Sequence, residues 1–141
     1  MKQTLLALIL SAWTLLATAD PELRVENAWV REAPPNAHMM AAYMTLKNPG
    51  SSAVLLTQVD SPAFDHVMLH KSEVVDGVAR MIHQDDILIP AQGAIALRPG
   101  SFHLMMPAPK QRLVEGDVVE FILTFSNGDT IRVPADVRKK P

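Results

Sequence analysis

Histidines and methionines whose side chains could bind a metal ion gather in one part of the chain. His70 is followed after ten residues by Met81, and after twenty-one more by His103-Leu104-Met105. The chain contains no cysteine. Imidazole nitrogens and thioether sulfurs are uncharged donors, and the soft thioethers favour monovalent copper over zinc, calcium or magnesium. The spacing therefore predicts a Cu(I) site formed by His70, Met81, His103 and Met105.

Other histidines and methionines could assist this site or could be ordinary structural residues. A methionine in a β-rich chain is more often core filler than a ligand, so the prediction rests on the four donors together. His83 and the cluster His38-Met39-Met40 are candidate auxiliary donors, although a rim histidine and a loop are the simpler interpretations. We expect Met68 and Met106 to be packing residues and His66 to be solvated.

The sequence offers little support for other chemistries. A blue-copper electron carrier needs a cysteine thiolate beside two histidines, and none is present. Ser72, His70 and Asp85 could be written as a hydrolytic triad, but no nucleophile elbow surrounds Ser72 and no oxyanion site is indicated. No glycine-rich phosphate loop occurs. We therefore predict a metal-binding protein that is not an enzyme.

The first nineteen residues have the parts of a secretory signal peptide. Lys2 supplies a basic start, residues 5–16 an apolar run, and Ala17-Thr18-Ala19 a small-residue cleavage pattern. Cleavage would leave residues 20–141 as one domain in the periplasm. The apolar run is too short for a membrane anchor, and no later segment approaches the roughly 20 apolar residues of a transmembrane helix. Without a cysteine near the cleavage site, we expect no lipid anchor.

Length and charge restrict the classes of partner. The 141 residues carry a formal net charge of −2, from 13 basic and 15 acidic side chains. No basic stripe of the kind that nucleic acid or an anionic membrane requires is present. We expect no nucleic-acid partner, no membrane insertion and a monomer. The predicted mature domain is long enough to bury a hydrophobic core without disulfides.

The distribution of turn residues predicts an all-β sandwich. Eleven prolines and scattered Gly, Asn and Asp divide the chain into short segments, without an apolar pattern at helical spacing longer than about two turns. The expected strands are 23–31, 41–46, 53–59, 66–75, 78–83, 87–90, 94–97, 102–106, 118–125 and 131–137.

One predicted hairpin would bring two of the four donors together. Asp76-Gly77 is a strong hairpin signal because both turn positions adopt positive φ. Pairing centred on this turn places His70 opposite His83 and leaves Met81 on the same face, offset by two positions. The two later donors lie two residues apart on one strand, so they also share a face. Four donors from two chain segments could thus form one site.

With these spacings, the chain resembles the periplasmic copper chaperone family called PCu(A)C, whose pattern is His, ten residues, Met, twenty-one residues, His-x-Met. The resemblance implies a cupredoxin-like Greek-key β-sandwich or barrel that binds one Cu(I) through two His and two Met. Many relatives have an extra methionine two residues after the first histidine, where this chain has Ser72. Further segments similar to the family are Ala28-Trp29-Val30-Arg31, Pro34-Pro35, Ala41-Ala42-Tyr43, Lys47-Asn48-Pro49-Gly50, Pro99-Gly100 and Glu115-Gly116-Asp117.

The resemblance also implies partners and a role. Its members pass copper toward the CuA centre in subunit II of cytochrome c oxidase, often together with a Sco-type thioredoxin-like protein. We therefore expect a periplasmic carrier that accepts Cu(I) and releases it by ligand exchange. Two alternatives are a copper-resistance buffer that stores the ion, and a metal-free immunoglobulin-like interaction module whose Met and His are ordinary structural residues.

Overall fold

The computed structural model describes residues 22–139, and every regular element in this range is a β-strand. The all-β prediction is confirmed, and each strand lies within two residues of its expected bounds. The predicted signal peptide, residues 1–19, lies outside the described residues. Between residues 22 and 139, no helix is long and apolar enough to cross a membrane. The strands are β1 (Arg24–Arg31), β2 (Met39–Asn48), β3 (Val54–Asp60), β4 (Met68–Val75), β5 (Val78–Gln84), β6 (Ile87–Ile89), β7 (Gly93–Leu97), β8 (Phe102–Pro107), β9 (Val118–Phe125) and β10 (Thr130–Arg138).

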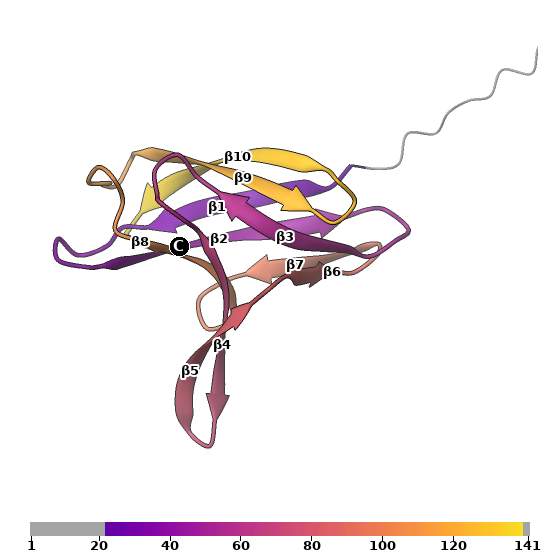
Figure 1. Ribbon diagram of the computed structural model, residues 1–141, viewed down its shortest axis with the longest axis horizontal. Helices are drawn as coiled ribbons and strands as arrows, with labels where there is room; N and C mark the ends of the chain where they lie inside the picture. Colours follow the sequence, from indigo (N-terminus) through magenta and orange to yellow (C-terminus); the bar gives the residue numbers. More distant parts are fainter. Residues whose placement is uncertain (1–21, 140–141) are drawn as a thin grey trace, which may run out of the picture.

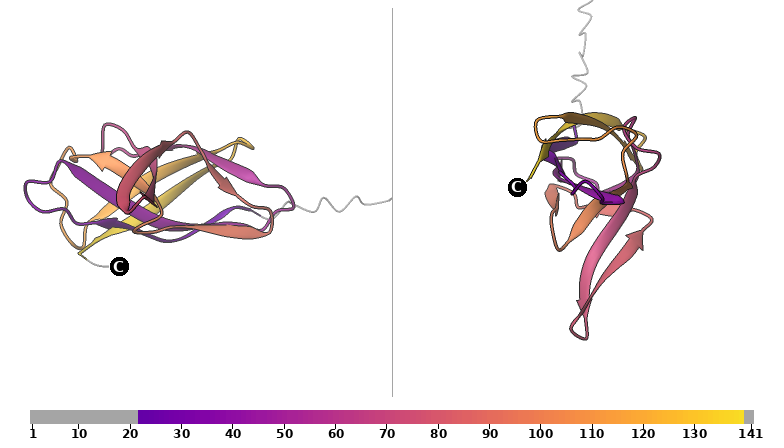
Figure 2. Two further views of the ribbon diagram at one scale, coloured as in Figure 1. Left: turned by 90° about the horizontal axis from the view of Figure 1, so that it is seen from below. Right: turned by 90° about the vertical axis from the view of Figure 1, so that its left-hand side faces the viewer.

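The ten strands form one sheet that curves into a barrel-like body. Its order is β5-β4-β8-β2-β1-β10-β9-β3-β6, and β7 pairs with β2 beside β8. The neighbours β1 and β10 are parallel, which brings the first and last strands side by side. The β4–β5 hairpin projects away from the body (Figures 1 and 2), and β5 occupies one end of the sheet. The fold therefore combines a barrel-like body with one projecting hairpin.

The body has a hydrophobic interior formed by alternate residues of its strands. In β9, for example, Val119, Phe121, Leu123 and Phe125 are buried while Val118 is exposed, as expected for a strand with one face on the core. Each large side chain buried in this way contributes about 1.5–3 kcal/mol to folding. The largest fully buried side chains are Phe121, Met44, Leu46, Leu56, Ile87, Ile89, Leu104, Met106, Leu123, Val30, Val119 and Val137.

The outer face of the sheet also buries two aromatic rings. Trp29 on β1 and Tyr43 on β2 are directly paired across the strands, and their ring centroids are 4.8 Å apart. Both are less than 10% exposed, at 6% and 7%, although their neighbours Val30 and Ala42 point to the core. They are therefore aromatic residues of the outer sheet face and do not belong to the hydrophobic core. They lie on the same face of the sheet as Met105, because Ala41 pairs with Met105 and Tyr43 is two residues from Ala41.

The turn of the projecting hairpin has the predicted geometry. Asp76 and Gly77 have φ values of 52° and 77°, the positive values that a two-residue hairpin turn requires. The pairing is centred on this turn, so that Ser72 lies opposite Met81 and His70 opposite His83. The predicted register is confirmed. The turn therefore determines which residue of β5 lies beside each residue of β4.

Replacing Gly77 with valine should loosen this hairpin. A Cβ at this position would meet no atom within 4 Å, so the cost is backbone strain at positive φ, about 1–2 kcal/mol. We expect faster amide hydrogen exchange in β5, with a smaller change in the core strand β9. Asp76→Asn is the matched control, because asparagine tolerates positive φ. Unchanged exchange in β5 would show that the turn does not maintain the register.

Candidate metal centre

The structure brings the two predicted histidine donors onto adjacent strands. Strand β4 lies between β5 and β8, and His70 on β4 is directly opposite His103 on β8. Their ring centroids are 5.9 Å apart, with the rings nearly perpendicular at 79°. Leu104, the residue after His103, points into the core and is completely buried. The two imidazoles therefore share the outer face of the sheet.

One nitrogen of His103 is oriented by the backbone and the other has no partner. Nδ1 lies 3.0 Å from the carbonyl oxygen of Ser101. Because a carbonyl oxygen only accepts, this contact requires a proton on Nδ1 and leaves Nε2 with a free lone pair in the neutral ring. Nε2 is buried and makes no hydrogen bond. This is the protonation pattern of a metal-binding histidine, whose second nitrogen donates to a carbonyl.

His70 presents a second buried nitrogen without a partner. Its Nδ1 makes no hydrogen bond. Burial, and then the neighbouring His103 and His83, lower the pKa of His70. The ring is therefore held in the neutral form, in which a nitrogen lone pair can bind a metal ion. Two unpartnered nitrogens on adjacent strands distinguish this place from the rest of the described chain, where no other buried side-chain N or O lacks a partner.

The two predicted methionine donors line one cavity on the same side of the sheet. Met105 is two residues from His103, and Met81 is two positions from the residue opposite His70, so both side chains belong to the histidine face. They contribute to a cavity of about 260 Å³. Met81 is 60% exposed, whereas Met105 is half-buried. The cavity lining includes neither His70 nor His103, and Met81 is the most exposed of the four predicted donors.

The remaining candidates fall into different environments. His66 is exposed, and Met106 is completely buried in the core, as predicted. His83 is largely exposed; its Nε2 lies 3.8 Å from Asp85 Oδ1. Asp85 therefore approaches His83, and the hydrolytic triad written with His70 is not assembled. Met68, expected to pack, is half-buried on the histidine face and lies directly opposite Met105.

Thioethers are needed to complete any metal site here. Over residues 22–139, no three His, Cys, Asp or Glu side chains converge to hold an ion.

The carbonyl of Ser101, which accepts from His103 Nδ1, is the feature of the site that the sequence analysis did not predict. No sequence signal could have found it, because every residue has a backbone carbonyl and only the fold selects the one that faces the imidazole.

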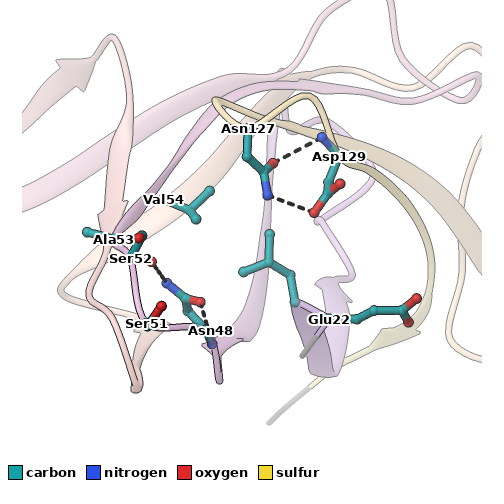
Figure 3. A pocket seen from close by; sticks show the side chains of 10 residues that line it. Glu22, Asn48, Ser51, Ser52, Ala53, Val54, Asn127 and Asp129 are labelled. Carbon is teal, nitrogen blue, oxygen red and sulfur yellow. Dashed lines mark hydrogen bonds between the residues drawn. The ribbon is translucent and has the colours of Figure 1, made fainter. Parts of the chain in front are cut away.

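A larger polar cavity lies at the other end of β2 and differs in chemistry. It has a volume of about 470 Å³ and is lined by loop residues near Asn48 (Figure 3). The Asn48 amide donates to the carbonyls of Ser52 at 2.8 Å and Ile89 at 3.3 Å. Asn127 and Asp129 bond to each other. These polar groups satisfy one another, unlike the imidazole nitrogens.

Sequence relatives place the chain in a family. The family described as "Putative lipoprotein LpqE-like" matches residues 23–137. The "Putative lipoprotein Lxx21020" of Leifsonia xyli subsp. xyli (strain CTCB07) is 31% identical over 117 residues, which cover 82% of this chain and 69% of that protein.

Solved structures share the fold. The solution structure of CuI-DR1885 from Deinococcus radiodurans is 30% identical, with a TM-score of 0.64 over 87% of this chain and 82% of that one. The copper-bound PCuAC domain from PmoF2 is 21% identical, with a TM-score of 0.71 over 87% of this chain and 97% of that one; at this identity the likeness concerns the fold. The chain belongs to the LpqE-like family, and it has the fold of PCuAC domains, as the sequence resemblance predicted.

Proposed function

We propose that the chain is a Cu(I) carrier, with the ion bound by His70, Met81, His103 and Met105. The observation that carries the proposal is the pair of buried, unpartnered imidazole nitrogens on the sheet face that also carries the two thioethers. All four donors are uncharged, and thioethers favour Cu(I) over harder ions. The protein would supply only the donors and their arrangement, and would perform no redox or covalent step.

The energetics favour a metal site over a metal-free interaction module. A buried polar atom without a partner costs about 1–3 kcal/mol, and His70 and His103 each contain one. A bound cation would satisfy both nitrogens at once. In a metal-free module nothing in the described chain would offset that cost. The histidine arrangement is therefore better explained by ion binding than by packing.

The relatives support copper and an exported location. Two structures with the same fold are described as copper-bound, CuI-DR1885 and the PCuAC domain from PmoF2. The family and its relative from Leifsonia xyli are described as lipoproteins, a class of exported proteins. Together with the predicted signal peptide, these descriptions support a periplasmic location, where a chain without cysteine has no thiol to be oxidised.

The exposure of Met81 supports delivery of the ion in preference to storage. Its side chain is 60% exposed on the edge strand β5, so a donor group of a partner can approach the ion from that side. A neutral, partly open set of four donors is suited to ligand exchange. We propose the CuA centre of cytochrome c oxidase subunit II as the recipient, with a Sco-type protein as a further partner.

Thioether ligation predicts a specific effect of leucine at the two methionine positions. Met81→Leu and Met105→Leu conserve volume, so the free energy of unfolding should change by less than about 1.5 kcal/mol. In an anaerobic competition titration, the wild type should bind one equivalent of Cu(I), and each variant should bind it more weakly. Met44→Leu, a methionine buried in the core, is the control and should bind like the wild type. Undiminished Cu(I) affinity in the double variant would refute thioether ligation.

Histidine ligation predicts a pH-dependent affinity. A proton on the metal-binding nitrogen of His70 competes with Cu(I), and the pKa of this ring is lowered, chiefly by burial. Affinity should therefore be constant at neutral pH and fall only at pH values below the reference pKa of about 6.5, as pH drops through the lowered pKa. Competition titrations across pH measure this. His66→Ala removes an exposed histidine and should leave the profile unchanged. An affinity that is flat from about pH 7.5 to about pH 4 would contradict histidine ligation.

A protein that delivers Cu(I) and a protein that stores it should behave differently when a copper-free acceptor domain is present. The Cu(I)-loaded protein should transfer its copper to a copper-free subunit II domain, alone or with a reduced Sco-type protein, because Met81 leaves the ion accessible. The transferred copper is measured in the re-isolated domain, and the CuA absorption should appear once a one-electron oxidant such as ferricyanide is added. The copper-free carrier is the control. If a small chelator removed the ion readily but the subunit II domain acquired none, the protein would be a copper buffer.

A further inference from the structure

The cavity that contains Met81 and Met105 is also lined by Met40, which is 4% exposed, and by a methionine that is accessible to solvent. The accessible methionine is Met39, the first residue of β2, and its side chain is 40% exposed. Strand β2 pairs with β8 on the side away from the hairpin, so Met39 reaches the cavity from a strand that supplies none of the four proposed donors. The cavity thus combines thioethers from three separate strands, β2, β5 and β8.

The pleat of β2 separates Met39 from its neighbours in the His38-Met39-Met40 cluster. Met40 pairs with Met106, is 4% exposed and belongs to the hydrophobic core. His38 precedes the strand and is exposed. Only Met39 combines partial exposure with a position on the face of Met105. The sequence suggested the three residues as one group, and the structure distinguishes them.

The register places Met39 beside Met105, on the side away from His103, and the shared cavity also brings it near Met81. Ala41 is directly opposite Met105, so Met39 is the diagonal neighbour of Met105. Diagonal neighbours on one face have Cβ atoms roughly 7 Å apart, which long side chains can bridge. The intervening residue on β2 is alanine, whose methyl group leaves the space between the two thioethers open. Met39 can therefore approach the side of the site opposite the hairpin.

We infer that Met39 is a further thioether donor, which binds Cu(I) while one of the imidazoles is not bound to it. This role rests on the Cu(I) site proposed above. The step is a ligand exchange, in which a copper–nitrogen bond breaks as a copper–sulfur bond to Met39 forms. No electron or proton is transferred, and the ion remains Cu(I). Met39, Met81 and Met105 would then hold the ion with neutral, soft donors as it enters or leaves.

A double-mutant cycle with His70 tests this role. In the wild-type background, Met39→Leu should lower the equilibrium Cu(I) affinity by less than about threefold, because both imidazoles are present. In the His70→Ala background, where a donor is missing, the same change should lower it by about tenfold or more. Anaerobic competition titrations with a chromophoric Cu(I) chelator measure all four proteins. Circular dichroism establishes that each protein is folded.

A control variant and an NMR measurement of contact between Met39 and the ion complete the experiment. Met44→Leu lies on the same strand, in the core, and should have an equally small effect in both backgrounds. In His70→Ala protein labelled at its methionine methyl carbons, the Met39 resonance should shift on addition of diamagnetic Ag(I), a probe of the same charge and softness. The resonance is assigned by its absence in Met39→Leu.

Three outcomes would overturn the inference without affecting the proposed site. These are an equal effect of Met39→Leu in both backgrounds, an unshifted Met39 resonance, and complete loss of Cu(I) binding in folded His70→Ala protein. Failure of the wild type to bind one equivalent of Cu(I) would instead refute the proposed function itself. The two failures are therefore distinguishable in the same set of titrations.

Discussion

The alternation of side chains on three paired strands is the constraint on which the candidate metal centre depends. On β5, β4 and β8, alternate residues face outward, and the register aligns His70 with His103 and His83. A slip of one residue between β4 and β8 would turn one imidazole toward the core and the leucine beside it toward solvent. The same register that satisfies the backbone hydrogen bonds of the sheet therefore also positions the donors.

The hydrophobic core maintains this register. Leu69 and Leu104, the neighbours of the two histidines, are directly paired across β4 and β8 and are 5% and 0% exposed. Exposing either leucine would cost about 1.5–3 kcal/mol. The imidazole pair is therefore positioned by folding, before any ion is present. Met81 is different, because it lies on an edge strand of a projecting hairpin where fewer neighbours constrain it.

The methionines divide into two groups according to the face of the sheet on which they lie. Met40, Met44 and Met106 fill the core, where an unbranched thioether adapts to irregular space. Met39 and Met105 are adjacent in sequence to two of these, yet they point outward. Consecutive methionines on one strand therefore point to opposite faces, and the number of methionines does not distinguish a proposed ligand from a packing residue. The pleat of the strand makes the distinction.

Much of the fold, and the sheet faces of the proposed donors, were predictable because they depend on local properties of the chain. Turn residues and period-two patterns located the ten strands, and Asp76-Gly77 predicted the hairpin register that relates His70 to Met81. The spacing of two residues between the later donors, His103 and Met105, placed them on one face. These inferences need no knowledge of which distant segments meet.

Tertiary structure alone decided the rest. Pairing of β4 with β8 brings His70 beside His103 across 33 positions of sequence, and a strand pattern does not specify its distant partner. Pairing of β8 with β2 adds Met39 to the cavity. The burial of one nitrogen on each imidazole, and the Ser101 carbonyl that orients one ring, follow from the same packing. The sequence by itself determined the types of the proposed donors and the faces they occupy, whereas non-local strand pairing determined which of them lie close together.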